Sequence, residues 1–446
     1  MLIDPSPRSA VLLHLLMTFL QSGPEIPEGG FDPTSRAAAV EAHAAIREKL
    51  EDLTPDPVFI RPFLVADREA REVWVLGEMT GMILGDPVEF FVITDRSGQD
   101  YEALMTTWLT PSALHEALEF IGLTAGGSVN TNAHRLWPRG DPVEASLILL
   151  TGEDPQLSEI PAHEWITRPD GSIMEKMPWV FTGAPMLPHP QIEGKKVYGA
   201  DQFSPHSIAS TFNLHNTLFD LPVQGGKTQV YGTFLRNTAL ETVQGQPVVL
   251  RLRPTPEDRR RPEQDYFLRL PRADTAPLEA LIRTAQDAAD TLFWVTPDFG
   301  PDLTLMDLRS FANTLRVLEE QEEQIRIEPP VAGQLYYQAF APPERFRDRS
   351  RRPSQPLEIH LHRDSIGTRA TLFEIEELWD ENRTPALVEH RRSLETPEEW
   401  LHYLEANDPL IRVLFVFAPD DMRHHELNTW LSPVYTLFPV IYVYRH

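Results

Sequence analysis

The sequence contains no cysteine in its 446 residues. It can therefore form no disulfide, no thiolate nucleophile, no cysteine-ligated zinc site and no cysteine-held iron–sulfur cluster. A chain without cysteine suits either an oxidising or a reducing compartment. These absences exclude a large group of redox and thiol-dependent activities, and we expect no cofactor.

Positive charge is scarce, since 40 basic residues face 66 acidic ones and the formal net charge is −26. A polyanion repels phosphate backbones and anionic lipid headgroups, so nucleic acid is not expected as a partner. Long apolar runs are also lacking. The stretch that most resembles one, Ala10 to Leu20, has eleven residues, against about 20 for a helix that crosses a bilayer. No integral membrane span is expected.

Residues 1–22, which contain this run, have two interpretations. The apolar segment follows Arg8, and Ser22 and Gly23 are small enough for a cleavage point, which favours a signal peptide and a periplasmic or secreted protein. Asp4 in the leader and the absence of an A-x-A triplet fit the alternative, an N-terminal helix packed on a cytoplasmic protein. Residues 23–57 read as a linker and a lead-in helix.

The chain is too long for one core, because single cores stop growing near roughly 250 to 300 residues. Hydrophobic residues make up 41% of it, enough to bury two or three cores. We expect residues 58–250 to form a mostly antiparallel α+β domain. Its clearest helix follows Thr110 as cap and Pro111 as first residue and ends at Gly122. Its expected strands are Val73 to Leu76, Phe90 to Thr94, Glu144 to Leu150, Trp179 to Thr182, Ser207 to Thr211 and Gln229 to Phe234.

The remaining chain predicts two small βαβαβ modules, so the fold class is α+β throughout. An Arg/Pro linker at 251–264 precedes module 1 at 265–341, and a second Arg/Pro linker at 342–354 precedes module 2 at 355–446. An insertion in module 2, 365–395, is rich in Glu and Arg and predicts a solvated helix plus loop. A spacing of 122 residues aligns Leu292, Phe293, Val295, Pro297 and Asp298 with Leu414, Phe415, Phe417, Pro419 and Asp420, which indicates an internal duplication.

Five blocks in the first domain carry a family resemblance. They are Leu76-Gly77-Glu78 with Glu89-Phe90-Phe91, the helix start Pro111 to His115, Ile160 to Ile166, Met177 to Gly183, and Ser210 to Pro222. In this order, over about residues 60–245, they resemble the YdjY-like domain, a bacterial family frequent in planctomycetes and without an assigned biochemical role. The resemblance implies an exported or envelope-associated protein and supplies no catalytic residue.

The order of elements after Tyr266 is similar, more faintly, to the periplasmic domains of biopolymer-transport proteins of the ExbD and TolR type. Those proteins share a transmembrane helix that nothing before Tyr266 matches. The resemblance implies, as one alternative, an accessory role in a cell-envelope transport complex without the motor function.

Two sets of side chains are candidates for a site. Asn213, His215 and Asn216, together with Trp165, could bind a ligand, although asparagines at this density more often satisfy backbone groups in a tight loop. His360 and His362 lie two apart on an expected strand and so on one face, the beginning of a metal site. A third ligand could be Asp364, His424 or His425; the simpler interpretation places these histidines on a solvated face.

No residue pattern here predicts a catalytic centre. We therefore expect an exported, non-catalytic protein that serves binding or assembly with an unidentified protein or envelope partner. The alternative is an enzyme, a metal-assisted hydrolase that uses His360, His362 and a carboxylate.

Overall fold

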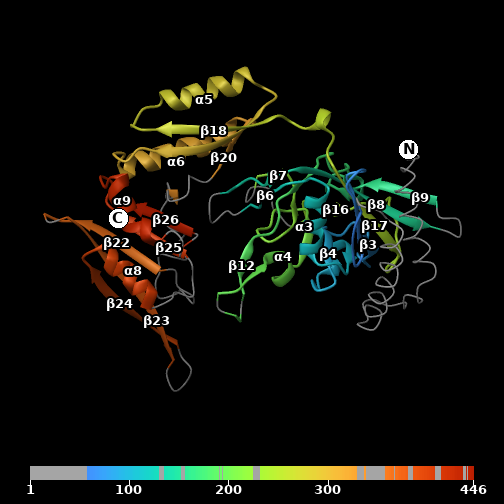
Figure 1. Ribbon diagram of the computed structural model, residues 1–446, viewed down its shortest axis with the longest axis horizontal. Coiled ribbons are helices and arrows are strands. Elements are labelled where there is room, and N and C mark those ends of the chain that lie inside the picture. Colours follow the sequence, from blue (N-terminus) through green and yellow to red (C-terminus); the bar gives the residue numbers. More distant parts are fainter. Residues whose placement is uncertain are drawn as a thin grey trace. The chain divides into compact units, whose positions relative to one another are not determined.

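The computed structural model describes residues 58–129, 135–151, 156–189, 191–192, 194–224, 232–328, 336–337, 357–365, 367–379, 385–406, 413–434, 438 and 440–445. The predictions for residues 1–57, for the linker at 342–354 and for the first half of the strand at Gln229 to Phe234 lie outside these residues. The second half, residues 232–234, forms a turn instead of a strand, so that part of the prediction was wrong. The chain divides into two compact units, one ending at Arg260 and the other beginning at Arg261. Both units combine helices and strands, which confirms the α+β class (Figure 1).

The first unit is built on an eleven-stranded sheet with the order β1-β2-β3-β17-β8-β11-β15-β14-β4-β5, and β9 pairs with β8. Because β5 also pairs with β3, the strands from β3 to β5 along this path close into a barrel. The pairings β14–β15 and β4–β5 are parallel and the others are antiparallel, as the sequence predicts in the main. These strands are β1 Val58–Arg61, β2 Leu64–Asp67, β3 Glu72–Met79, β4 Phe90–Thr94, β5 Ala103–Thr107, β8 Pro142–Thr151, β9 Gln156–Pro161, β11 Trp179–Phe181, β14 Ser207–Ser210, β15 Phe219–Asp220 and β17 Pro247–Pro254.

Helix α3 (Pro111–Phe120) packs Leu114 and Leu118 into the core of this barrel. It ends as predicted, with Gly122 at a positive φ of 85°. Its start differs from the prediction, because the Thr110 side chain makes no cap hydrogen bond. The Ser112 amide donates instead to Oδ1 of Asp201, at 2.9 Å. A residue distant in sequence has taken the role of the local cap, which a local pattern cannot foresee.

Shorter elements complete the first unit. They are β6 Ala125–Gly127, β7 Arg139–Gly140, β10 Ile166–Thr167, β12 Met186–Pro188, β13 Lys196–Tyr198, β16 Leu235–Arg236, the helix α4 Gly199–Gln202, and 3-10 turns at Asp100–Glu102, Ala162–Trp165 and Glu257–Arg259.

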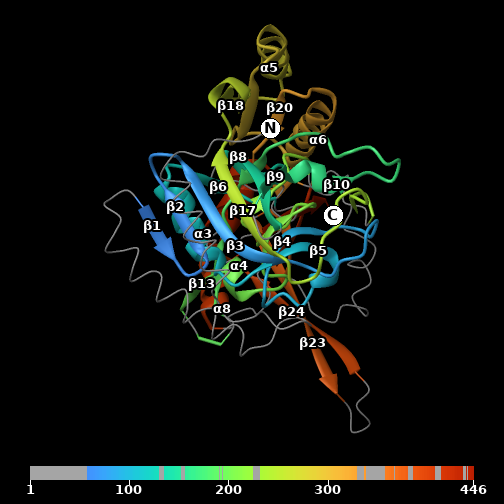
Figure 2. The same cartoon turned by 90° about the vertical axis from the view of Figure 1, so that its right-hand side faces the viewer.

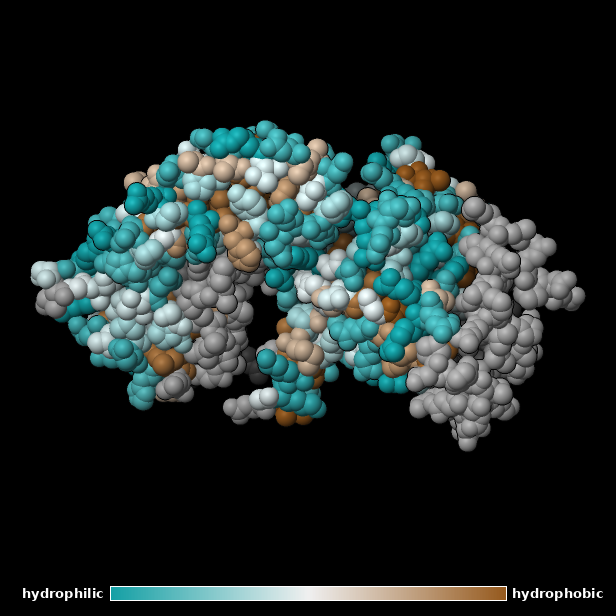
Figure 3. Space-filling view, turned by 45° about the horizontal axis from the view of Figure 1, so that its top comes forward, coloured by the Kyte–Doolittle hydropathy of each residue, from teal (hydrophilic) through white to brown (hydrophobic). Residues whose placement is uncertain are grey.

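The second unit opens with the predicted βαβαβ order. Its three parallel strands lie in the order β18-β19-β20, connected through two helices. The helices turn apolar faces to the sheet, and the surface of the unit where α5 lies is mainly hydrophilic (Figure 3). The elements are β18 Glu263–Leu270, α5 Ala276–Asp287, β19 Leu292–Phe299, α6 Leu305–Gln321 and β20 Ile325–Ile327.

The rest of the second unit has a six-stranded sheet in the order β21-β26-β25-β22-β23-β24. Strands β22, β25 and β26 are parallel and again follow the βαβαβ order. Both parts bury their side chains in one shared cluster, which includes Leu308 from α6 and Leu427 from α9. The elements are β21 Tyr336–Tyr337, β22 Leu357–Arg363, β23 Thr368–Trp379, β24 Pro385–Leu394, α8 Pro397–Ala406, β25 Val413–Ala418, α9 His424–Leu431, a 3-10 turn at Ser432–Val434 and β26 Val440–Arg445.

The prediction for the insertion at 365–395 was wrong. It forms an antiparallel hairpin of β23 and β24, not a helix plus loop, and the hairpin extends from the sheet (Figure 2). The composition suggested a helix, but side chains such as Leu372 and Phe373 alternate between the two faces of the sheet. Cross-strand pairs such as Phe373 with Arg391, whose guanidinium lies 5.2 Å from the ring centre, stabilise the hairpin.

Candidate binding pocket

The loops that follow β19 and β25 meet inside the second unit. The Leu305 amide donates to the Met422 carbonyl and the His424 amide donates to the Leu303 carbonyl, each at 2.8 Å. Leu303 and Met422 are 119 residues apart, as are Leu305 and His424, so the two hydrogen bonds are equivalent. A local two-fold relation therefore passes between Thr304 and Arg423, which form an antiparallel bridge.

This relation corrects the alignment drawn from the sequence. A spacing of 122 pairs Phe293 with Phe415, but Phe293 belongs to the shared core of the unit whereas Phe415 packs on Tyr442 and Tyr444. A spacing of 122 differs from the observed spacing of 119 by three residues, and because strand side chains alternate between faces, this odd shift matches one face with the other. The structure pairs the loops at an odd spacing, 119. Whether the two parts arose by duplication stays a prediction.

A pocket of about 340 Å³ lies beside this meeting point. It is at the carboxyl ends of parallel strands and next to the start of α9, the usual place for ligands in sheets of this kind. Its walls come from the end of β19, the following loop and one face of α9. They consist of Phe299, Pro301, His424, His425, Asn428, Thr429 and Ser432.

His424 forms part of the pocket wall but is almost fully buried, at 2% exposure. Its Nδ1 lies 3.2 Å from the Gly300 carbonyl, which can only accept, so Nδ1 carries the proton. Its Nε2 then accepts from Nδ2 of Asn428, at 3.1 Å. Burial lowers the pKa of His424 and backbone carbonyls offset part of this effect. His424 is therefore a neutral residue that holds Asn428 in place.

His425 is the exposed histidine of the pair. Its Nδ1 lies 3.0 Å from the Pro301 carbonyl and, by the same reasoning, donates to it. In the tautomer with the proton on Nδ1, Nε2 is the acceptor nitrogen of the ring. Thr429 donates its hydroxyl to the His425 carbonyl, at 2.8 Å, and its oxygen keeps lone pairs for a further donor.

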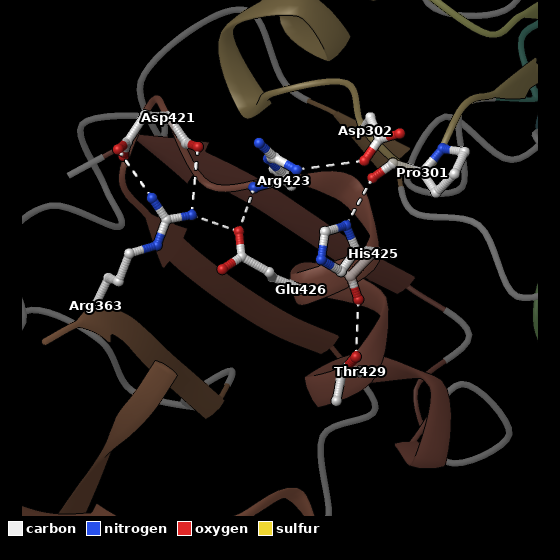
Figure 4. A network of polar contacts seen from close by, with 8 residues as sticks. All are labelled: Pro301, Asp302, Arg363, Asp421, Arg423, His425, Glu426 and Thr429. Carbon is white, nitrogen blue, oxygen red and sulfur yellow. Dashed lines mark hydrogen bonds and ion pairs between the residues drawn. The ribbon is translucent and has the colours of Figure 1, made fainter. Parts of the chain in front are cut away.

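A polar network fixes the start of α9 next to the pocket (Figure 4). Arg363, at the end of β22, donates to Oδ2 of Asp421 at 3.0 Å and also pairs with Glu426. The same Glu426 accepts the Arg423 amide at 2.8 Å, which caps the helix. Arg423 reaches Asp302 of the other loop at 3.4 Å. The helix end that forms the pocket is therefore held by groups from three segments.

The equivalent position on α6 shows why the pocket exists on one side. There Arg309 occupies the place of Asn428 and pairs with Asp420 at 3.6 Å. Asp420 is itself the equivalent of Pro301, 119 residues away. On the α9 side a short amide and a proline replace this ion pair, so space remains beside the helix.

The four candidate ligand residues in the first unit have structural partners. Asn213 donates to the Val223 carbonyl at 2.7 Å, and Asn216 donates to the Ser204 carbonyl at 3.0 Å. Ser128 donates to the His215 carbonyl at 2.7 Å. Trp165 is fully buried in the barrel core. Asn213 and Asn216 bond backbone carbonyls, the local role that the sequence offered as the simpler interpretation.

His360 and His362 lie on one face of β22, as predicted, with ring centres 6.3 Å apart. Nε2 of His360 lies 2.6 Å from Glu358, and its ring stacks on Phe417 with centres 4.6 Å apart. Among the residues described, no group of three or more His, Asp or Glu side chains could hold a metal ion. Metal binding by this pair stays a prediction.

The pocket was only partly predicted from the sequence. His424 and His425 were predicted as possible third metal ligands, whereas Asn428, Thr429 and Ser432 were not predicted as site residues. These residues follow at one helical turn and two, so they lie on the same face as the histidines. The sequence signal that could have revealed the pocket is a pair of adjacent histidines at the start of a helix, followed by small polar residues on the same face.

Comparison with known proteins identifies part of the first unit. Residues 64–194 match the model of the YdjY domain, which confirms the expected resemblance in that region. No curated protein and no solved structure matches the chain. The match ends before the second unit, so the pocket lies outside it. In the described part of the chain, no helix is long and apolar enough to cross a membrane.

Proposed function

We propose that the protein is a non-catalytic binding protein whose second unit holds a small, uncharged polar ligand beside α9. The main observation behind the proposal is that both pocket histidines are hydrogen-bonded to backbone carbonyls. His424 and His425 each donate Nδ1–H to a carbonyl, so both rings have fixed orientations. Fixed rings suit recognition, because a ligand meets hydrogen-bond groups that need no reordering.

The pocket wall defines the ligand chemistry. Nε2 of His425 accepts, the hydroxyls of Thr429 and Ser432 accept or donate, and Phe299 supplies an apolar surface. A hydroxylated or amide-bearing molecule satisfies this set, and a volume of about 340 Å³ suits a small one. Asp302 and Glu426 nearby disfavour an anion.

NMR of histidine side chains tests the proposal with three named uncharged probes: glucose, N-acetylglucosamine and acetamide. We expect at least one probe to shift the His425 ring resonances in a saturable manner. Asn428→Arg copies the residue at the equivalent position, Arg309, and fills the pocket, so it should abolish the shift. Asn313→Arg makes the same change on an exposed position of α6 and should leave the shift intact. No saturable shift from any probe, or an equal shift in Asn428→Arg, would reject the proposal.

Export and assembly with an envelope partner form the second part of the proposal. The apolar run after Arg8 and the YdjY match support it. Mass spectrometry of the mature N-terminus tests it, with cleavage near Ser22 as the expected result. An intact leader on protein recovered from the cytoplasm would overturn this part and leave the ligand proposal unaffected.

A further inference from the structure

Strand β18 is an edge strand with an exposed face. Within the described residues it pairs with β19 and with no other strand. Its even-numbered side chains Leu268 and Leu270 are buried under the helices, whereas Asp265, Phe267 and Arg269 are exposed on the opposite face. The Phe267 side chain is 68% exposed. An eight-residue edge with an apolar centre is a ready surface for pairing with another strand.

The charges on this edge are self-complementary. In an antiparallel pair of two identical strands centred on Phe267, each Phe267 lies opposite its equivalent. Asp265 then lies opposite Arg269 of the other copy, and this contact occurs twice. Opposite charges and aromatic rings directly across a sheet are favourable cross-strand pairs.

Other registers do not give this match. A shift by one residue places exposed Phe267 opposite Tyr266, which belongs to the helix face, so the two sheets would not share a face. Centring on Tyr266 also brings Glu263 opposite Arg269, but Glu263 already accepts a hydrogen bond from Trp294, and this register places Asp265 opposite Phe267. Centring on Leu268 places Phe267 opposite Arg269. The register centred on Phe267 is therefore the one that puts two ion pairs directly beside an apolar contact.

We propose that β18 pairs antiparallel with β18 of a second copy of this chain and forms a homodimer with a continuous six-stranded sheet. The two-fold axis passes through the Phe267 pair. This is an isologous contact, in which the same patch serves both copies and closes the assembly. None of the residues of β18 lines the pocket, so this pairing does not depend on the ligand.

Cross-linking provides the first test, because the chain has no cysteine of its own. Residues opposite each other in an antiparallel pair have Cα atoms about 4.5 to 5.5 Å apart, which a disulfide can span. Full-length Phe267→Cys should form a disulfide dimer under mild oxidation. The control Val243→Cys, at a residue 73% exposed in the first unit, should remain largely monomeric. Cross-linking of Cys at 267 that is no faster than at 243 would overturn the proposal.

Charge reversal with analytical ultracentrifugation is the second test. Asp265→Arg or Arg269→Asp alone should weaken dimerisation roughly tenfold or more, since each creates two like-charge contacts. The double variant restores both pairs and should recover the dimer. Asp287→Arg on exposed α5 is the matched control and should dimerise as the unmodified protein does. A monomeric unmodified protein, or a double variant as weak as the single ones, would contradict the proposed register.

Discussion

Asp220 shows how one buried carboxyl can set a pH dependence. It is fully buried in the first unit, and its Oδ1 accepts the Leu214 amide at 3.0 Å. Its Oδ2 has no hydrogen-bond partner among the described residues. Burial raises the pKa of Asp220 well above its usual value, and backbone amides offset part of this effect. The folded protein therefore holds a proton on Asp220 at a pH where the unfolded chain has lost it.

We predict that Asp220→Asn makes the first unit less sensitive to pH. A raised folded pKa means that stability is fully present below the unfolded pKa, about 3.9, and falls as pH rises toward the folded pKa. Asparagine keeps the carbonyl acceptor without ionising. The free energy of unfolding of Asp220→Asn, relative to that of the unmodified protein, should therefore increase between pH 4 and pH 8. The increase should be about 1.4 kcal/mol for each pH unit between the unfolded and the folded pKa of Asp220.

Urea unfolding across this pH range measures the effect. Glu241→Gln, at an exposed carboxylate of the same unit, is the control and should show no comparable trend. A constant offset between Asp220→Asn and the unmodified protein at every pH would contradict the prediction. The pH trend, rather than the offset, is diagnostic because the new amide group adds a desolvation cost that does not change with pH.

At the scale of single elements, local patterns predicted most helices and strands of the second unit. Helix α8 begins and ends where the sequence predicts, at Pro397 and Ala406. The hairpin at 368–394 was missed because its stability comes from cross-strand pairing, such as Phe373 with Arg391, that composition does not reveal. The pocket was only partly predictable, since its opposite wall, Pro301, comes from a segment over 120 residues away.

The start of α6 allows an element-scale prediction. Thr304 accepts the Asp307 amide at 3.2 Å, and Asp307 accepts the Thr304 amide at 2.9 Å, a complete capping box. Thr304→Ala should lower the free energy of unfolding by about 1 kcal/mol. Thr314→Ala, within the same helix and exposed, should change it little because alanine favours helix. Equal effects of the two substitutions in equilibrium unfolding would show that the box contributes nothing.

At the scale of the whole molecule, contacts between segments distant in sequence could not be predicted from local patterns. The barrel depends on the pairing of β3 with β17, in which Leu76 lies opposite Val249. The sequence predicted β3 but not β17, whose last four residues were expected to belong to the linker at 251–264, and it could not supply the register of the pair. Likewise, the two βαβαβ parts were predicted as modules, and nothing local indicated that Leu308 and Leu427 would share one core. The finer domain boundaries stay predictions.

This shared core leads to a prediction for thermal unfolding. Because the two units have separate cores, calorimetry should show two transitions. Leu308→Ala removes a fully buried side chain from the second unit and should cost about 2 to 5 kcal/mol, which lowers that transition by on the order of 10 °C. Leu250→Ala, buried in the first unit, is the reciprocal variant and should lower only the other transition. Since the core joins both βαβαβ parts, they should unfold together. If the second unit instead unfolded in two separate transitions, and Leu308→Ala moved only one of them, the two βαβαβ modules would be independent.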